Sequence, residues 1–187
     1  MGKDRRTASV HCGGCGNPCA WGCVGCGACE KACQSGAITI SASGTAHVCR
    51  QKCTGCGACM GTCPRSLITL LPAWGSIEVR CANQDAGAIA RKIYKNSCIG
   101  CGICEKVCPV GAISVTISAS VRTGGEIGAS GHMPLKHLAN SKGSRCSNLA
   151  VIDQDRCISC GMCAVNCPRG VIHDTFGVLT EEGEGES

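Results

Sequence analysis

Cys98–Pro109 reads CIGCGICEKVCP, four cysteines at the spacing C-x2-C-x2-C-x3-C with a proline directly after the last. The pattern returns at Cys53–Pro64 (CTGCGACMGTCP) and at Cys157–Pro168 (CISCGMCAVNCP). A fourth copy spans Cys23–Cys33 (CVGCGACEKAC), where Gln34 stands in place of the proline. The four copies use sixteen of the 22 cysteines. This spacing is typical of chains that ligate [4Fe-4S] clusters.

Each copy predicts a loop that surrounds one corner of a cuboidal cluster with three thiolates. Glycines between the cysteines allow a positive φ, so that amide N–H groups can point at the sulfurs and stabilise negative charge. The loop glycines are Gly25, Gly27, Gly55, Gly57, Gly100, Gly102 and Gly161. The fourth cysteine is expected on a short helix, facing away from its own loop, because in two-cluster ferredoxins it ligates the other cluster. The fold class predicted is α+β, with two tandem bacterial-type 2[4Fe-4S] ferredoxin domains.

The copies are therefore expected to exchange their fourth cysteines in pairs. The predicted ligand sets are Cys23, Cys26, Cys29 and Cys63; Cys53, Cys56, Cys59 and Cys33; Cys98, Cys101, Cys104 and Cys167; and Cys157, Cys160, Cys163 and Cys108. Each cluster would join two halves of the sequence, so metal binding would also contribute folding energy. Structural zinc favours two well-separated C-x2-C pairs, and a disulfide framework favours a secreted chain, so both fit this pattern poorly.

The spacing of the motifs predicts a division of the chain. We expect a cysteine-rich amino-terminal segment at 1–22, a first ferredoxin domain at 23–82, a helical spacer at 83–97, a second ferredoxin domain at 98–180 with an inserted loop at 118–146, and an acidic tail at 181–187. Residues 1–11 are expected to be disordered. Apolar runs predict strand hairpins between 37–40 and 46–48, between 67–71 and 77–81, and between 170–173 and 178–180, with further strands at 112–117 and 149–152.

The spacer is expected to form a helix over 83–95, capped by Asn83 or Asp85. Its apolar positions Ala88, Ile89, Ile93 and Tyr94 are expected to pack on the ferredoxin domain.

Three more cysteines, Cys12, Cys15 and Cys19, precede the first motif in HCGGCGNPCAWGC. Their spacing, with glycines between, is plausible for a fifth cluster, but the fourth ligand is not evident. The candidates are Cys49, Cys81, Cys146 and, at the cost of the next site, Cys23. The alternative is that these are spare thiols.

Composition limits the class of protein. Aromatic residues make up only 2% of the chain, so a core held by packing alone would be weak, and clusters acting as staples resolve this. The formal charge of +5 counts cysteines as neutral; four clusters at about −2 each would bring it to about −3. A nucleic-acid partner is therefore not expected. No run reaches the ~18 apolar residues of a membrane span, and oxygen-sensitive clusters favour a reducing, cytoplasmic location.

Beyond the motifs, the sequence resembles the B subunit of Rnf complexes, the membrane-bound ferredoxin:NAD+ oxidoreductases. The specific part is the spacer SIEVRCANQDAGAIARKIYKNSCIGCGICEKVCPVGAI, supported by NLAVIDQDRCISCGMCAVNCPRGVI and by CGGCGNPC. In that family a C-x3-C-x5-C-x3-C arrangement maps to Cys19, Cys23, Cys29 and Cys33, so Cys19 competes with Cys26 for the first cluster.

The resemblance implies a subunit that accepts electrons from soluble ferredoxin and passes them towards membrane and flavin/NAD subunits. It would lie peripherally on the inner face of the membrane through those partners. The chain shows no Rossmann fingerprint, so no substrate catalysis is expected on it. The alternatives are a freestanding polyferredoxin and an accessory subunit of a hydrogenase, formate or carbon monoxide dehydrogenase. Five charged residues flank the cluster loops and could shape a docking face: Glu30, Lys31, Glu105, Lys106 and Arg169.

Overall fold

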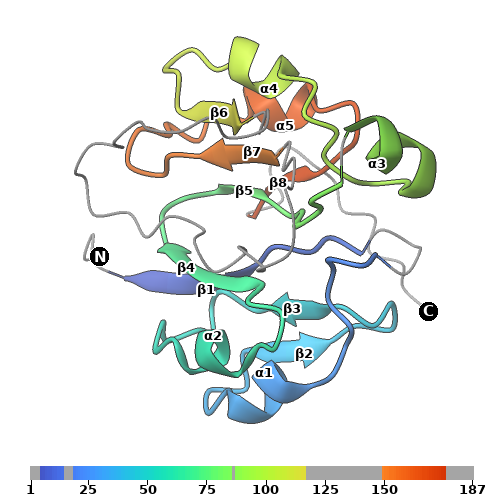
Figure 1. The fold of residues 1–187 in the computed structure, drawn as a ribbon. Helices are drawn as coiled ribbons and strands as arrows, with labels where there is room; N and C mark the ends of the chain where they lie inside the picture. The colour runs from blue at the N-terminus through green and yellow to red at the C-terminus, as the bar shows by residue number, and fades with distance from the viewer. Residues whose placement is uncertain (1–4, 15–18, 86, 117–148, 176–187) are drawn as a thin grey trace, which may run out of the picture.

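The computed structural model describes residues 5–14, 19–85, 87–116 and 149–175. These residues form two similar units, one after the other in the chain (Figure 1). The first unit contains β1 (Arg6–Val10), α1 (Ala28–Ala32), β2 (Ile38–Ile40), β3 (Ala46–Val48), α2 (Ala58–Thr62) and β4 (Ile68–Pro72). The second contains β5 (Ile77–Val79), α3 (Gly87–Ile93), α4 (Ile103–Lys106), β6 (Ile113–Thr116), β7 (Leu149–Ile152), α5 (Met162–Val165) and β8 (Ile172–Asp174).

Each unit has two antiparallel pairs of strands, which we call inner and outer by their order in the sequence of the unit and not by their position in space. The inner pairs are β2–β3 and β6–β7, and each joins the two cysteine motifs of its unit. The outer pairs are β1–β4 and β5–β8, and each joins the beginning of its unit to the end. Short helices and two-stranded sheets around the repeated cysteine motifs agree with the predicted α+β class.

Two expectations about strands were wrong. Residues 6–10 form strand β1 and are not disordered, and β4 pairs with β1 and not with 77–81, which pairs instead with β8. The pattern RTASV concealed the strand, because the residues that it buries include the small polar Thr7 and Ser9. The linker after β4 leads to the second unit, and the Arg50 guanidinium holds it by donating to the carbonyls of Pro72, Ala73 and Gly75.

A third hairpin was predicted between 170–173 and 178–180. Residues 178–180 lie outside the described residues, as does the predicted insertion at 118–146. The division into domains stays a prediction. Strand pairing favours counting β1 with the first unit and β5 with the second.

The two outer sheets face each other between the units (Figure 1). The His11 ring nitrogen Nδ1 lies 3.1 Å from the carbonyl oxygen of Val79, which places the end of β1 against the end of β5. The buried Glu78 carboxylate accepts a hydrogen bond from the Ser9 hydroxyl and forms an ion pair with Arg80 at 2.7 Å. These contacts fix the amino-terminal strand against the second unit.

The spacer helix is shorter than expected and turned differently. Helix α3 spans seven residues, Gly87–Ile93. It buries Ala90, and Tyr94 directly after the helix is also buried, whereas Ile89 and Ile93 are about half exposed. The predicted apolar stripe was therefore wrong at both isoleucines. Asn83 does not cap the helix; its Oδ1 accepts from the amide of Asp85, and Asp85 in turn accepts from the Tyr94 hydroxyl at 2.8 Å.

Both hydrophobic cores are built around cysteines. In the first unit the core residues include Ile38, Ile68, Cys29, Cys53 and Cys59. In the second they include Ile77, Ile113, Ile172, Cys98, Cys104 and Cys163. Thiols therefore occupy positions where another small protein would carry large apolar side chains.

Candidate iron–sulfur sites

The four motifs fold alike. A glycine in left-handed conformation precedes each short helix, and the third cysteine, not the fourth as expected, lies on the helix. These third cysteines, Cys29, Cys59, Cys104 and Cys163, are buried, whereas the second cysteines, Cys26, Cys56, Cys101 and Cys160, are exposed. The fourth cysteine follows the helix by one or two residues. Each motif therefore has one edge in the core and one at the surface.

In the first unit, a small cavity brings together thiols from two motifs. Three come from the first motif, Cys23, Cys26 and Cys29, and the fourth is Cys63 from the second. Cys19 does not line this cavity. The four cysteines grouped here are the first predicted ligand set, with Cys26 and not Cys19.

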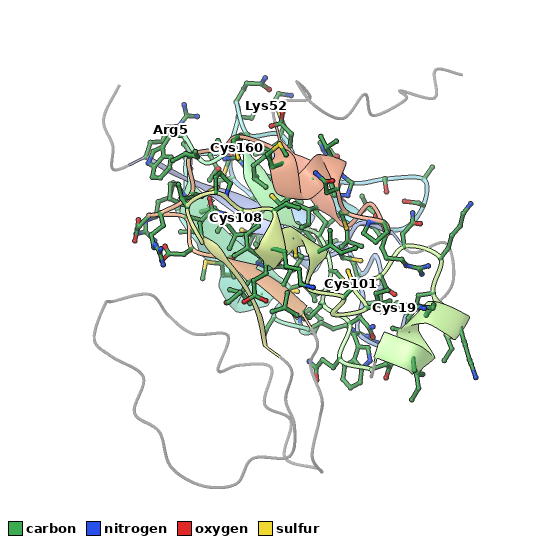
Figure 2. The ribbon with its side chains drawn as sticks, turned by 90° about the horizontal axis from the view of Figure 1, so that it is seen from above. Arg5, Cys19, Lys52, Cys101, Cys108 and Cys160 are labelled. Atoms are coloured by element: carbon green, nitrogen blue, oxygen red, sulfur yellow. The ribbon has the colours of Figure 1, made fainter. Side chains whose placement is uncertain are left out.

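The second unit repeats this arrangement. A small cavity is lined by Cys98, Cys101 and Cys104 of the third motif and by Cys167 of the fourth. Equivalent apolar residues close both cavities: Ile40, Leu67 and Ile68 in one, and Val115, Val171 and Ile172 in the other. Figure 2 shows Cys101 and Cys160 well apart, so the exposed edges of the third and fourth motifs face different parts of the surface.

For the remaining two sets, electrostatic coupling shows which thiols are near one another. After burial, the charges of Cys53, Cys33 and Cys56 raise the pKa of Cys59, so Cys33 of the first motif stands near the second motif. Cys157 and Cys160 raise the pKa of Cys163 in the same way. Cys108 packs against the core that contains Cys163.

Backbone amides donate to several of these sulfurs, as a cluster-binding loop requires. Ala37, Leu67 and Ala112 donate to the fourth cysteines Cys33, Cys63 and Cys108 at 3.2–3.4 Å, each four residues further along the chain. Strand β1 adds a donor from outside the motif, the Ala8 amide, which lies 3.3 Å from the Cys53 sulfur. Four thiols with amide donors directed at sulfur fit a [4Fe-4S] cluster, because such donors stabilise its negative charge.

The loop glycines adopt the positive φ expected of them, between 64° and 79°. Position 159, where the fourth motif has serine in place of glycine, is also left-handed, with φ of 56°. The Ser159 hydroxyl accepts from the Ser76 amide at 3.4 Å, which ties this loop to the linker between the units.

Burial raises the pKa of the thiols that face the core. Desolvation is the largest cause for Cys29, Cys59 and Cys98, and it raises the pKa of Cys104 and Cys163 to about 11. Without metal these thiols hold their protons at neutral pH. Because the ligand is the thiolate, metal binding must release those protons. Within the described residues, no group of three or more His, Cys, Asp or Glu side chains is arranged to hold a single metal ion.

The sequence analysis missed two anchoring arginines. After Cys63-Pro64, Arg65 donates to the carbonyl of Ala20; after Cys167-Pro168, Arg169 donates to the carbonyls of Ser97 and Tyr94. Each guanidinium thus holds the backbone just before the first cysteine of the partner motif. Arg169 is therefore an internal brace, not part of a docking face. The recurring C-P-R sequence was the available signal.

Cysteines outside the four motifs fall into two groups. Cys12, Cys19 and Cys81 lie near the junction of the units, where burial raises the pKa of Cys81 to about 11, with smaller contributions from the charges of Cys98 and Cys19. Cys49 lies elsewhere, with its thiol donating to the Gln51 side chain at 3.3 Å. Cys15 and Cys146 are outside the described residues. No helix in the described part of the chain is both long enough and apolar enough to cross a bilayer.

Comparison with known proteins shows what this chain is similar to. A relative from Acetobacterium woodii, the B subunit of a Na(+)-translocating ferredoxin:NAD(+) oxidoreductase complex, is 34% identical over 169 residues, which is 90% of this chain and 41% of the relative. The resemblance to Rnf B subunits is thus confirmed, although the chain spans less than half of that protein's length. A solved formate dehydrogenase–heterodisulfide reductase–formylmethanofuran dehydrogenase complex from Methanospirillum hungatei contains a chain that is 22% identical to this one. The match covers 81% of this chain and 51% of that chain, and its TM-score is 0.29.

The family profile for the 4Fe-4S dicluster domain matches three overlapping stretches, 22–67, 52–112 and 97–171. Together these stretches include all four motifs and most of the chain. The chain therefore belongs to the 4Fe-4S dicluster domain family.

Proposed function

We propose that this chain is the ferredoxin-accepting subunit of an Rnf-like redox complex. In this proposal its sixteen motif cysteines hold four [4Fe-4S] clusters as two pairs. Iron–sulfur electron transfer itself follows from the family. The finer role is supported by the A. woodii relative, whose identity with this chain extends through the spacer and both units. The observation that carries the ligand assignment is the convergence of thiols from two motifs on one cavity in each unit.

When bound, [4Fe-4S] clusters supply one-electron transfer at potentials that their surroundings adjust. The residues of this chain hold the thiolates, donate amide hydrogen bonds to sulfur and exclude water with apolar side chains. The buried third cysteine and the exposed second cysteine give each cluster site a path between the core and the surface. Electrons could enter and leave at those exposed edges.

Partner proteins are expected to contact the molecule at these edges. Glu30 and Lys31 on α1, and Glu105 and Lys106 on α4, are exposed beside the cluster loops at equivalent places in the two units. They offer a mixed-charge rim for a soluble ferredoxin at one unit and for a flavin/NAD or membrane subunit at the other. Hydride and ion transfer would belong to those partners, and the chain would lie at the inner face of the membrane through them.

The proposal is tested by anaerobic mixing of the full chain with a reduced two-cluster ferredoxin. Bleaching of this chain's iron–sulfur absorbance on a millisecond-to-second scale supports an electron-accepting role. Failure to accept electrons from any ferredoxin, with clusters intact, overturns it. Co-purification with flavin and membrane subunits supports the Rnf-like complex, whereas a monomer that exchanges electrons with several unrelated enzymes supports the freestanding polyferredoxin.

A further inference from the structure

We propose that three exposed cations beside the second cysteine motif, Arg5, Arg6 and Lys52, form the docking face for an acidic iron–sulfur protein that delivers electrons to this chain. The inference rests on the proposed function, because it names the face at which a ferredoxin would bind. In each encounter the ferredoxin loses one electron and the chain gains one. The second motif, in the first unit, is then the point of entry.

Two of these cations lie on the turn that leads into the second motif. The Arg5 guanidinium donates at 3.3 Å to three carbonyls of this turn, those of Arg50, Gln51 and Cys53. Lys52 stands in the turn, directly before Cys53, and is exposed. Figure 2 shows Arg5 and Lys52 near the same edge of the molecule. The residue before β1 therefore places a guanidinium on the turn that also carries Lys52.

Arg6, the first residue of β1, borders the same loop. Its backbone carbonyl lies against Gly55, between Cys53 and Cys56, where a side chain would not fit. Arg6 is exposed whereas the next residue, Thr7, is buried, so the Arg6 side chain stands at the surface. Cys56 is itself exposed. A protein that contacts these cations therefore lies over the exposed edge of the second motif.

Within the described residues, none of the three cations forms an ion pair. Residues 31–77, which include the whole second motif, contain no aspartate or glutamate. The next acidic residue, Glu78, is buried and paired with Arg80, and Asp4 lies outside the described residues. The three positive charges exceed in size the charge of about −2 that an oxidised cluster with four thiolates carries. The docking face therefore stays positive when the site is loaded.

The second unit has the opposite charge at the equivalent turn. The two turns correspond because the carbonyls of Cys49 and Asp153 accept from the first cysteine of the following motif, at 3.1 and 3.0 Å. Residues 49–53 read CRQKC, with two cations and no acid, whereas residues 153–157 read DQDRC, with two acids and one cation. All three charged side chains of the second turn are exposed. An acidic protein is therefore attracted to the second motif and repelled at the fourth.

Charge complementarity identifies the partner as an acidic iron–sulfur protein. A protein with two [4Fe-4S] clusters gains about −4 from the clusters alone, so a small carrier of this kind is drawn to a positive face. The rim on α1 does not make this selection, because Glu30 and Lys31 carry opposite charges. An anionic membrane would also be attracted, but it would cover the exposed Cys56 edge through which electrons must enter.

The test is stopped-flow reduction of the anaerobic, cluster-loaded full chain by a reduced, acidic two-cluster ferredoxin. Three versions are compared: the unchanged chain, the double variant Arg6→Glu/Lys52→Glu, and the matched control Arg156→Glu, which reverses the equivalent cation of the second unit. At low ionic strength the second-order rate constant is expected to fall about tenfold or more in the double variant and less than about twofold in the control. High ionic strength should remove most of the difference, because salt screens exposed charges.

Two further measurements separate docking from damage to the site. Reduced methyl viologen, itself a small cation, should reduce the double variant at least as fast as the unchanged chain; equal slowing with this reductant would assign the effect to the cluster potential and overturn the proposal. A carbodiimide, which joins amines to carboxylates, is expected to cross-link the ferredoxin to Lys52 and not to Lys106 on α4. If the double variant loads fewer clusters, Lys52→Gln decides: slowing of several-fold at low ionic strength supports the docking face, and an unchanged rate refutes it.

The remaining outcomes distinguish the docking face from the proposed function. Equal rates in the unchanged chain and the double variant, an equal loss in Arg156→Glu, or cross-linking confined to Lys106 overturns the docking face and leaves the proposed function intact. Binding to phosphatidylserine vesicles that the double variant loses, while its rate with ferredoxin is unchanged, assigns the face to a membrane and also overturns the proposal. A cluster-loaded chain that no ferredoxin reduces refutes both.

Discussion

Replacing Gly55 with alanine is expected to push strand β1 off the second cysteine loop. Gly55 lies between Cys53 and Cys56 with φ of 76°, and a methyl group there would lie only 2.3 Å from the Arg6 carbonyl oxygen. That oxygen belongs to the backbone of β1, so the clash cannot be relieved by rotating a side chain. Either the strand or the loop must move.

The structure sets the size of the effect. The left-handed conformation itself costs about 1–2 kcal/mol once a side chain is present. Moving β1 away also loosens the hydrogen bond from the Ala8 amide to the Cys53 sulfur, and those from the Arg5 guanidinium to the carbonyls of Arg50, Gln51 and Cys53. At about 0.5–1.5 kcal/mol for each bond lost, with the exposed Arg5 bonds at the low end, the total destabilisation is about 3–5 kcal/mol.

The matched control is Gly57→Ala. Gly57 has nearly the same φ, 79°, but a methyl group there would meet side-chain atoms at ordinary contact distances, the Leu70 Cδ1 at 3.7 Å and the Met60 Sδ at 3.9 Å. This variant is expected to lose only the conformational cost of about 1–2 kcal/mol. The assay is guanidinium unfolding of the anaerobic, cluster-loaded protein, followed by iron–sulfur absorbance. Equal sensitivity of the two variants would refute the packing of β1 on the loop.

Four further predictions concern the cluster sites. Cys63→Ser is expected to remove the cluster of the first motif and not that of its own motif, because Cys63 lines the cavity of Cys23 and Cys26. Loss of the Mössbauer or EPR signal of the second motif's cluster, with the first motif's signal unchanged, would contradict this. Arg169→Ala is expected to speed loss of iron to a chelator several-fold by freeing the backbone before Cys98, whereas Arg156→Ala, at an exposed site, should change little; equal rates would contradict the bracing role. Reconstitution is expected to accelerate between about pH 6.5 and 8.5 and to release protons, because burial holds the pKa of Cys104 and Cys163 at about 11, well above that range, and both thiols must ionise to bind iron; a flat rate in a stopped-flow pH series would count against it. Removal of all iron is expected to unfold the chain, since its cores are built around thiols; a sharp melting transition of the iron-free protein by circular dichroism would show otherwise.

The cysteine motifs allowed most of the local structure to be predicted, because their chemistry is local. The spacing C-x2-C-x2-C with glycines between dictates a loop of fixed shape, and the left-handed glycines, the hairpin β2–β3 and the strands β6 and β7 appear where they were expected. Cys63 lines a cavity with the thiols of the first motif, and the exchange of ligands between repeats stays a prediction.

Features that depend on contacts between distant residues were not predictable in this way. Strand β1 has no apolar alternation because it buries Thr7 and Ser9 between two units, where Ser9 meets Glu78. Helix α3 presents Ile89 and Ile93 outward, and its first residue, Gly87, lies against the Ile99 backbone, where a side chain would not fit. Neither partner lies near in sequence.

Cys81 illustrates the same limit. In the sequence it was one of six cysteines outside the four motifs. Only the folded chain shows that it occupies, in the second unit, the place that Cys12 occupies in the first. The repeat was visible in the motifs, but its extension to the residues after each outer strand became visible only once β1 and β5 were known to be equivalent.

The most direct measurement is the number of iron and acid-labile sulfide atoms per anaerobically isolated chain, read together with the EPR spectrum after reduction. This account predicts about sixteen of each, for four clusters held by the motif cysteines, with signals of magnetically interacting [4Fe-4S] clusters from paired sites. Zinc in place of iron, or a chain that remains folded with fewer than about eight irons, would contradict the claim that clusters shared between repeats hold this fold together.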